Sequence, residues 1–254
     1  MGNTYVFVNQ KGGVGKTTSA INIGAYLAEA GKTVLLIDFD SQANLSSGVG
    51  INAKTAKPGV YELISGIASL EETIRPTAIE NLSVIPSSLD LSGAAVELID
   101  QDERDYFLKK ALQPVKNRFD FILIDCPPSL GVLTINGLAA SDAVLIPLQC
   151  EYFAMEGLSH LLQTIRRIKK GTNPSLEIGG IFFTMYDSRT RLAQQVIKEV
   201  TGYFRDKVFK TIIPRNIRLS EAPSHGEPII KYDPQSSGAK AYRNLAGEVL
   251  QSGC

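Results

Sequence analysis

A glycine-rich segment near the start of the chain, from Asn9 to Thr18, constrains the fold more than any other stretch. The apolar run Tyr5–Val8 precedes it and predicts a buried strand, and residues 19–28 after it predict a helix. Glycines let backbone N–H groups turn inward and a helix N-terminus carries partial positive charge, so this order predicts a phosphate cradle. The alternative, a glycine-rich turn with two surface lysines, leaves the Gly-Lys-Thr order between strand and helix unexplained.

The residue types within this loop match the parts of a nucleotide-phosphate site. We expect Lys16 to reach the β- and γ-phosphates and the Thr17 hydroxyl to ligate Mg²⁺. The loop departs from the standard phosphate-loop motif in two respects. Gln10 stands where that motif has a glycine, and Lys11 is an additional lysine.

The order Lys-Gly-Gly-Val-Gly-Lys-Thr-Thr resembles the deviant Walker A motif of the ParA/MinD family of P-loop ATPases. The resemblance implies an ATP site and a homodimer formed with ATP, in which Lys11 reaches the phosphates held by the other subunit and Gly12 lies at the interface. A second cation stabilises charge on the transferring phosphoryl group, so Lys11 and Lys16 are both predicted to be catalytic. The loop residues expected to bind ATP are Lys11, Gly12, Gly13, Val14, Gly15, Lys16, Thr17 and Thr18.

A second apolar run, Thr33–Ile37, ends in Asp38. A strand, a helix and a strand within about 35 residues predict a βαβ unit and therefore an α/β fold. We expect a doubly wound, mostly parallel sheet flanked by helices, as in P-loop NTPases of the deviant Walker A type. Strands buried on both faces explain the unbroken apolar runs. With 254 residues and 44% hydrophobic residues, the chain is expected to form one ATPase domain over 1–254.

Acidic residues follow two of the predicted strands. Asp38 and Asp40 come after the second strand, and Asp125 ends the apolar run 119–124. Ligands of open α/β sheets bind at the carboxyl ends of strands, so these acids are expected beside the phosphate loop. The Asp125 strand is a Walker B element whose carboxylate would hold Mg²⁺. The alternative for Asp38 and Asp40 is that they cap a turn.

Residues 38–44 also resemble the family's switch I region. That resemblance implies that Asp40 orients or deprotonates the attacking water and that Asp38 supports the Mg²⁺ shell. Residues 125–131 resemble its switch II, where we interpret Cys126 as a packing residue because no arginine follows to close an anion loop.

Apolar spacing predicts further elements along the chain. The expected strands are 82–85, 143–148 and 178–186, and the expected helices are 58–64, 89–98, 103–112, 154–170 and 236–250. Residues 46–81 are otherwise interpreted as a surface excursion. Three cysteines, Cys126, Cys150 and Cys254, are too few and too scattered for a disulfide framework, which favours a reducing compartment.

Basic residues are concentrated between Arg189 and Arg218. This segment holds eight basic and two acidic residues, a net +6, whereas the whole chain has a formal charge of zero. Such a cluster predicts salt-sensitive contact with nucleic-acid phosphates without sequence preference, and the alternative is a solvated face. In the Soj/ParA branch of the family, arginines of this region bind DNA in the dimer. The resemblance points first to Arg189 and Arg218, supported by Arg191 and Lys198.

The segment 212–223, expected to follow a strand, resembles the part of the family fold that holds the adenine ring. Pro214 would pack on the ring and Asn216 would hydrogen-bond its edge, which suits an apolar wall with one placed amide. The alternative is a proline turn followed by a helix cap.

The two ends of the chain favour the short chromosomal ParA, or Soj, branch of this family. Residues 240–254 lack the basic amphipathic helix of the membrane-binding branch. The chain enters its first strand directly, so we expect neither a signal peptide nor an added N-terminal region. The expected location is cytoplasmic and nucleoid-associated, without a membrane partner.

The resemblance implies a chromosome or plasmid partitioning ATPase. An ATP-bound sandwich dimer would bind nonspecific double-stranded DNA, and slow hydrolysis stimulated by a ParB-type centromere-binding partner would return it to the monomer. Two alternatives remain open: a MinD-like positioning ATPase, and a nucleotide-switched regulator of replication initiation that has a replication initiator as its partner.

Overall fold

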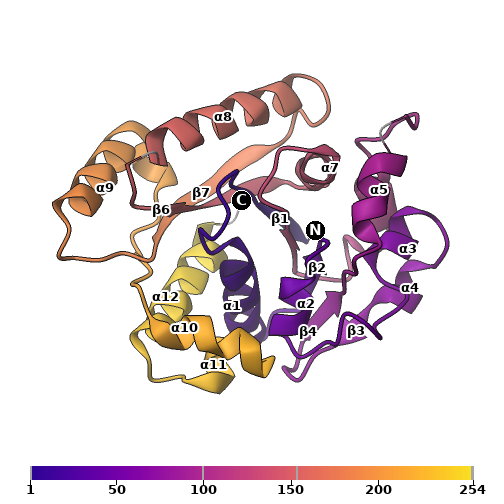
Figure 1. Ribbon diagram of the computed structural model, residues 1–254, viewed down its shortest axis with the longest axis horizontal. Helices are drawn as coiled ribbons and strands as arrows, with labels where there is room; N and C mark the ends of the chain where they lie inside the picture. Colours follow the sequence, from indigo (N-terminus) through magenta and orange to yellow (C-terminus); the bar gives the residue numbers. More distant parts are fainter. Residues whose placement is uncertain (1, 99, 153, 253–254) are drawn as a thin grey trace.

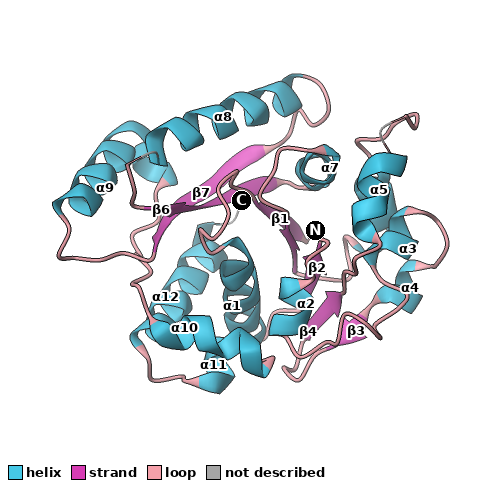
Figure 2. Cartoon of the chain, viewed as in Figure 1, coloured by secondary structure: helices cyan, strands magenta, loops and turns pink. Residues whose placement is uncertain are grey.

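The computed structural model describes residues 2–98, 100–152 and 154–252, so Cys254 lies outside the described residues. These residues form a seven-stranded sheet in the order β3-β4-β2-β5-β1-β6-β7 (Figure 2). All neighbouring strands are parallel except β3 and β4. The predicted mostly parallel, doubly wound sheet is therefore confirmed. The strands are β1 Asn3–Phe7, β2 Val34–Asp38, β3 Arg75–Pro76, β4 Leu82–Ile85, β5 Phe121–Asp125, β6 Ala143–Gln149 and β7 Glu177–Thr184.

Helices cover both faces of the sheet (Figure 1). One face packs against α3 Val60–Ile64, α4 Leu70–Thr73, α5 Leu91–Glu97, α6 Phe107–Leu112, α7 Val132–Ala140, α8 Ala154–Lys170 and α9 Arg191–Phe204. The other packs against α1 Lys16–Glu29, α2 Asn44–Gly48, α10 Ile217–Glu221, α11 Ile229–Tyr232 and α12 Ser237–Ser252. Three short 3₁₀ turns are η1 Gln113–Val115, η2 Arg205–Lys207 and η3 Ala222–His225.

The two apolar clusters follow from the alternation of side chains along each strand. In β5, Phe121 and Leu123 pack on the α1 side, whereas Ile122 and Ile124 pack on the α8 side. Successive strand residues point to opposite faces, so both sets must be apolar when helices cover both faces. This requirement explains the unbroken apolar runs of the sequence.

The register of the central strands brings the functional acids to one edge of the sheet. Asp38 at the end of β2 lies opposite Asp125 at the end of β5, and Phe7 at the end of β1 also pairs with Asp125. The loop that follows β1 therefore leaves the sheet beside both carboxylates. Parallel pairing thus places together residues that are far apart in the sequence.

Several predicted boundaries shift for identifiable reasons. The helix expected over 103–112 begins only at Phe107, because Glu103 takes a left-handed backbone with φ 57°. The segment expected to be a surface excursion contains the end of α2, the two short helices α3 and α4, and β3. The expectation that a strand leads into 212–223 is wrong, because no strand of the described chain directly precedes this segment. The segment lies alongside the end of β7, where the Ile213 N–H donates to the Phe183 carbonyl oxygen at 2.8 Å, and isolated bridges join Ile181 to Val208 and Tyr186 to Pro214.

Other expectations are confirmed. The helix predicted over 154–170 has those bounds, and the strand predicted over 82–85 does as well. Cys126 is buried in the core, as expected of a packing residue. Among the described helices, none is both long and apolar enough to cross a membrane.

Candidate functional site

The glycine-rich loop after β1 takes the conformation that the sequence predicts. Gly13 and Gly15 have left-handed backbones with φ 73° and 88°, and Gly15 directly precedes α1. Residues other than glycine rarely adopt this backbone conformation without strain, so the turn requires glycine at both positions. The loop is followed by a 14-residue helix, whose N-terminus faces the same space.

Two polar side chains outside the motif fix this loop to the sheet. The Asn9 amide donates to the Pro147 carbonyl oxygen at 2.8 Å, while its oxygen accepts from the Lys11 backbone N–H at 3.0 Å. The Thr184 hydroxyl at the end of β7 donates to the Val14 carbonyl oxygen at 2.8 Å. The loop is therefore held from β6 on one side and from β7 on the other.

The carboxylate of Asp125 faces the first turn of α1. The Thr17 hydroxyl donates to Asp125 Oδ2 at 2.6 Å, while the buried Oδ1 has no hydrogen-bond partner among the described groups. Burial and then repulsion from Asp38 raise the pKa of Asp125 to about 8, although the Thr17 hydrogen bond and Lys16 act in the opposite direction. An unpartnered buried carboxylate oxygen beside a hydroxyl is a site that suits a divalent cation.

This donor set fits Mg²⁺ rather than a metal held only by protein. Among the described residues there is no cluster of three or more His, Cys, Asp or Glu side chains that could cage an ion. Mg²⁺ keeps several waters and takes one or two protein oxygens together with substrate phosphates. Thr17 and Asp125 can supply those protein oxygens.

Asp38 has a different environment from Asp125. Its Oδ2 accepts hydrogen bonds of 2.7 Å from both the backbone N–H and the hydroxyl of Ser46, and its Oδ1 accepts from the Asp40 backbone at 3.3 Å. Burial raises the pKa of Asp38 to about 6 against these hydrogen bonds. Asp38 thus holds the loop after β2, which is the turn-capping alternative, and its support of a Mg²⁺ shell stays a prediction.

Asp40 is less buried than Asp38 and lies at the start of the same loop. Its carboxylate accepts from the Gln42 backbone N–H at 3.0 Å. Asp40 also acts electrostatically on Lys16 and Asp125, so it belongs to the same charged cluster. A role in orienting water remains a prediction.

The two lysines of the loop lie in different environments. Lys16 is buried, which lowers its pKa despite the attraction of Asp125, and its Nζ donates to the Lys11 carbonyl oxygen at 3.4 Å. Lys11 is half exposed and forms an ion pair with Glu151, with Gln149 Oε1 at 3.4 Å. In the single chain Lys11 is therefore bound beside the end of β6.

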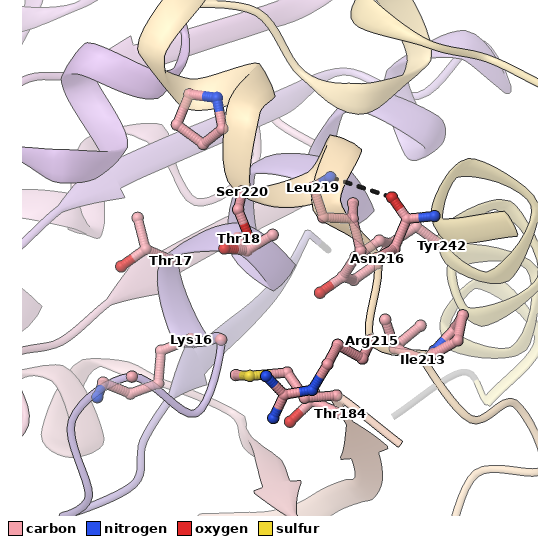
Figure 3. A pocket seen from close by; sticks show the side chains of 15 residues that line it. Lys16, Thr17, Thr18, Thr184, Ile213, Arg215, Asn216, Leu219, Ser220 and Tyr242 are labelled. Atoms are coloured by element: carbon pink, nitrogen blue, oxygen red, sulfur yellow. Dashed lines mark hydrogen bonds between the residues drawn. The ribbon is translucent and has the colours of Figure 1, made fainter. Parts of the chain in front are cut away.

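A cleft of about 390 Å³ joins the phosphate loop to the segment predicted to hold adenine. Figure 3 shows Lys16 and Thr17 on one side of this cleft and Asn216 and Leu219 on the other. The cleft lining comprises Gly13, Gly15, Lys16, Thr17, Thr18, Thr184, Met185, Ile213, Pro214, Arg215, Asn216, Leu219, Ser220, Pro223 and Tyr242. The structure thus brings together two segments separated by about two hundred residues.

Pro214 and Asn216, the two residues predicted to contact adenine, both line this cleft. Asn216 is also the helix cap that the alternative proposed. Its Oδ1 accepts from the Leu219 backbone N–H at 3.3 Å, and its Nδ2 donates to the Ser237 hydroxyl at 2.8 Å. Its contact with a base stays a prediction.

The four residues predicted to bind DNA lie in two places. Arg189, Arg191 and Lys198 lie just before or within α9, and Arg218 lies on α10, which is well separated from α9 in Figure 1. All four are exposed. A single chain therefore presents two basic positions rather than one continuous row.

Both leading arginines are bound to carboxylates of the same chain. Arg189 donates from Nε to Asp187 Oδ1 at 2.8 Å and from Nη2 to Oδ2 at 2.5 Å, and this pair holds the pKa of Asp187 well below its usual range. Arg218 contacts Glu221 at 2.9 Å and Asp233 at 3.4 Å.

Sequence reasoning missed several side chains that build the site. Asn9 and Thr184 anchor the loop, Ser46 binds Asp38, and Tyr242 bonds the Ser19 hydroxyl at 2.9 Å below the cleft. Asn9, next to the motif, carried a signal, because asparagine often bonds a backbone N–H two residues ahead. Thr184 acts across 170 residues, Tyr242 across 223 and Ser46 across 8, and none of these contacts has a local sequence signal.

Comparison with known proteins agrees with this geometry. A family model described as an AAA domain matches residues 2–178. The chromosome-partitioning ATPase Soj of Treponema pallidum is 63% identical over 250 residues, covering 98% of each chain. The sporulation initiation inhibitor protein Soj of Bacillus subtilis is 55% identical over 253 residues, covering 100% of each chain.

A solved structure extends the comparison to three dimensions. Cobyrinic acid a,c-diamide synthase from Mycobacterium smegmatis, crystallised with ADP and magnesium and with an ATP analogue and magnesium, has a TM-score of 0.86. It is 37% identical, and the match covers 99% of this chain and 95% of that one. The phosphate loop, the acids at the strand ends and the full-length similarity to Soj proteins together show that the chain belongs to the ParA/MinD family of P-loop ATPases, in its chromosome-partitioning Soj/ParA group.

Proposed function

We propose that this chain is a partitioning ATPase whose ATP-bound form is a DNA-binding sandwich dimer. The observation that carries the proposal is the cleft that runs from the phosphate loop to Asn216, with the unpartnered Asp125 oxygen at its phosphate end. ATP occupies this cleft and Mg²⁺ is held through Thr17 and Asp125. The whole chain acts as one ATPase domain, since α12 packs on α1 beneath the cleft.

The chain's own residues divide the work of hydrolysis. The backbone N–H groups from Gly13 to Thr18 bind the phosphates, and Lys16 neutralises charge on the β- and γ-phosphates. Bound Mg²⁺ supplies neutralisation of the charge that develops between these phosphates. Asp40 orients the attacking water or accepts its proton.

Lys11 supplies the second cation, and it acts on the nucleotide of the other subunit. Its present partner, Glu151, lies outside the cleft, so Lys11 must leave that ion pair when the dimer forms. Gly12 agrees with an interface role, because a Cβ added there would meet only Pro128 at 3.9 Å. The fold of one chain therefore does not require glycine at this position.

The dimer binds double-stranded DNA nonspecifically and so associates with the nucleoid. Arg189 and Arg218 make the leading phosphate contacts, with Arg191 and Lys198 in support. Two chains would bring their basic positions onto one surface. A ParB-type centromere-binding partner then stimulates slow hydrolysis and returns the protein to the monomer.

Three substitutions test the switch by light scattering during gel filtration with Mg²⁺ and ATP. Lys16→Ala should lose nucleotide binding. Gly12→Val should bind nucleotide and stay monomeric, because a side chain would separate the subunits. Asp40→Ala should stay dimeric, since it binds ATP without hydrolysing it, and a monomeric Asp40→Ala would refute the mechanism.

DNA binding in three nucleotide states tests the second half of the proposal. Binding to duplex DNA only with ATP, weakened at high salt, is the expected result. Loss of that binding in Arg189→Glu or Arg218→Glu, with ATP binding intact, would assign the surface. Absence of DNA binding in every nucleotide state would refute the DNA-binding dimer, whereas the proposal that ATP binds in the cleft would be unaffected.

A second candidate is a nucleotide-switched regulator whose dimer is recognised by another protein, such as a replication initiator. The name of the Bacillus subtilis relative, a sporulation initiation inhibitor, favours some regulatory role for proteins of this type. Capture of a replication initiator by the Asp40→Ala dimer but not by Gly12→Val would support it. Equal capture by both variants would count against it.

A further inference from the structure

Arg215 lies in the nucleotide cleft and has no role in the function described so far. Its backbone is fixed to the end of β7, because Arg215 N–H donates to the Tyr186 carbonyl oxygen at 3.1 Å and Tyr186 N–H donates to that of Ile213 at 3.0 Å. In Figure 3 its side chain extends towards the side of the cleft where Lys16 lies, with the guanidinium near Thr184. The fold therefore presents a cation between the phosphate loop and the proposed base wall.

The Arg215 guanidinium is free for a ligand. Across residues 2–98, 100–152 and 154–252 it forms no hydrogen bond or ion pair, although it is exposed. It acts electrostatically on Asp187, both of whose carboxylate oxygens already accept from Arg189. Arg189 and Arg218, in contrast, are both bound to carboxylates.

The chemistry of the cleft around Arg215 favours an anion. Thr184 lies beside it in Figure 3 and is uncharged, as is Met185 of the same cleft lining, and Lys16 already concentrates positive charge at the neighbouring end. A guanidinium presents a planar fork of N–H donors that matches two phosphate oxygens. In a cleft that holds phosphates at one end and a base at the other, the span between them is occupied by the sugar, and the phosphate attached to that sugar lies where this span meets the phosphate end.

We propose that Arg215 binds the sugar-proximal phosphate of the nucleotide held by its own chain. The proposal rests on ATP occupying the cleft and adds to Lys16 a second cation of the same chain that binds the phosphates. Arg215 is then a nucleotide-binding residue, although it belongs to the basic segment otherwise assigned to DNA.

The test measures binding of ADP and of adenosine to Arg215→Ala, Arg215→Lys and wild type by calorimetry with Mg²⁺. ADP affinity should fall about tenfold in Arg215→Ala, the cost of one charge-assisted phosphate contact, and recover in part in Arg215→Lys. Adenosine affinity should not change, because adenosine has no phosphate. The matched control is Arg205→Ala, an exposed arginine of the same segment outside the cleft, which should bind ADP as wild type does.

DNA binding at saturating ATP separates this proposal from the competing assignment. Arg215→Ala should bind duplex DNA normally once the nucleotide site is filled. Unchanged ADP affinity with lost DNA binding would overturn the proposal and place Arg215 on the DNA surface. An equal loss of ADP and adenosine binding would also overturn it, as a general distortion of the cleft. If wild type bound no nucleotide, the proposed function itself would fail.

Discussion

Replacing Asp187 by asparagine should strengthen the binding of the ATP form to nonspecific duplex DNA. In the structure both oxygens of Asp187 accept from the Arg189 guanidinium, so this arginine is neutralised within its own chain. A phosphate must compete with Asp187 for the same donors. Asparagine keeps the shape of the side chain and removes its charge, which leaves Arg189 free for DNA.

The size of the expected gain in DNA affinity follows from counterion release. Each additional cation that neutralises a phosphate steepens the dependence of log affinity on log salt by about 0.9. One freed guanidinium per chain gives two per proposed dimer, so the slope should steepen by about 1.8. When the salt concentration is lowered from 200 to 50 mM, the ratio of the DNA affinity of Asp187→Asn to that of wild type should therefore rise about twelvefold.

Fluorescence anisotropy with a labelled duplex, at several salt concentrations and with the Asp40→Ala background to prevent hydrolysis, would measure these slopes. Glu199→Gln is the matched control, because it removes one negative charge from α9, and among the described residues the Glu199 carboxylate accepts a hydrogen bond only from Gln195. The double variant Asp187→Asn with Arg189→Ala should lose the gain. Equal salt slopes for Asp187→Asn and Glu199→Gln would refute the reasoning.

Three further predictions concern the loop, the core and a thiol. Glu151→Gln should release Lys11 and lower the protein concentration needed for the ATP dimer a few-fold in light scattering; an unchanged midpoint would contradict this. Gly137→Ala should destabilise the fold by about 1–3 kcal/mol in urea titration, because the new Cβ would lie 2.6 Å from a buried sulfur atom. Its control Gly247→Ala, whose Cβ would meet no described atom within 4 Å, should stabilise α12 by about 0.5–1 kcal/mol, and equal losses would contradict the packing argument. Burial raises the pKa of the Cys150 thiol to about 11, so little thiolate exists at pH 8. Its peptide-mapped alkylation should be about a hundredfold slower than that of a free thiol and accelerate as the pH rises towards 11, whereas a rate that levels off near pH 9 would count against the raised pKa.

The sequence predicted the phosphate end of the site well because its signals are local. The left-handed glycines Gly13 and Gly15 and the hydroxyl of Thr17 lie within one loop and one helical turn. Asp125 required one further step, since the parallel sheet brings the ends of β1 and β5 together. That step depends only on fold class, which the apolar runs and the βαβ spacing determine.

The rest of the site depends on contacts that local patterns do not encode. Thr184 bonds Val14 across 170 residues, and Lys11 reaches Glu151 across 140. The bonds that neutralise Arg189 required knowing its conformation, because Asp187 is near in sequence but only the folded turn aligns both oxygens. A charge count over 189–218 found the basic segment but could not separate free from paired arginines.

The same long-range contacts set when the nucleotide cleft can exist. Ser19 bonds Tyr242 across 223 residues, and Asn22 accepts from the Ile229 backbone across 207. Closing a loop of this length is slow because it costs chain entropy. The contacts that offset this cost can form only when both ends of the loop are present. A ribosome-bound chain that has emerged only through β7 would carry the phosphate loop but lack the wall formed by 213–223 and α12. High-affinity nucleotide binding should therefore arise late in synthesis. In the finished chain, bound ATP should hold the first helix and the last helix together.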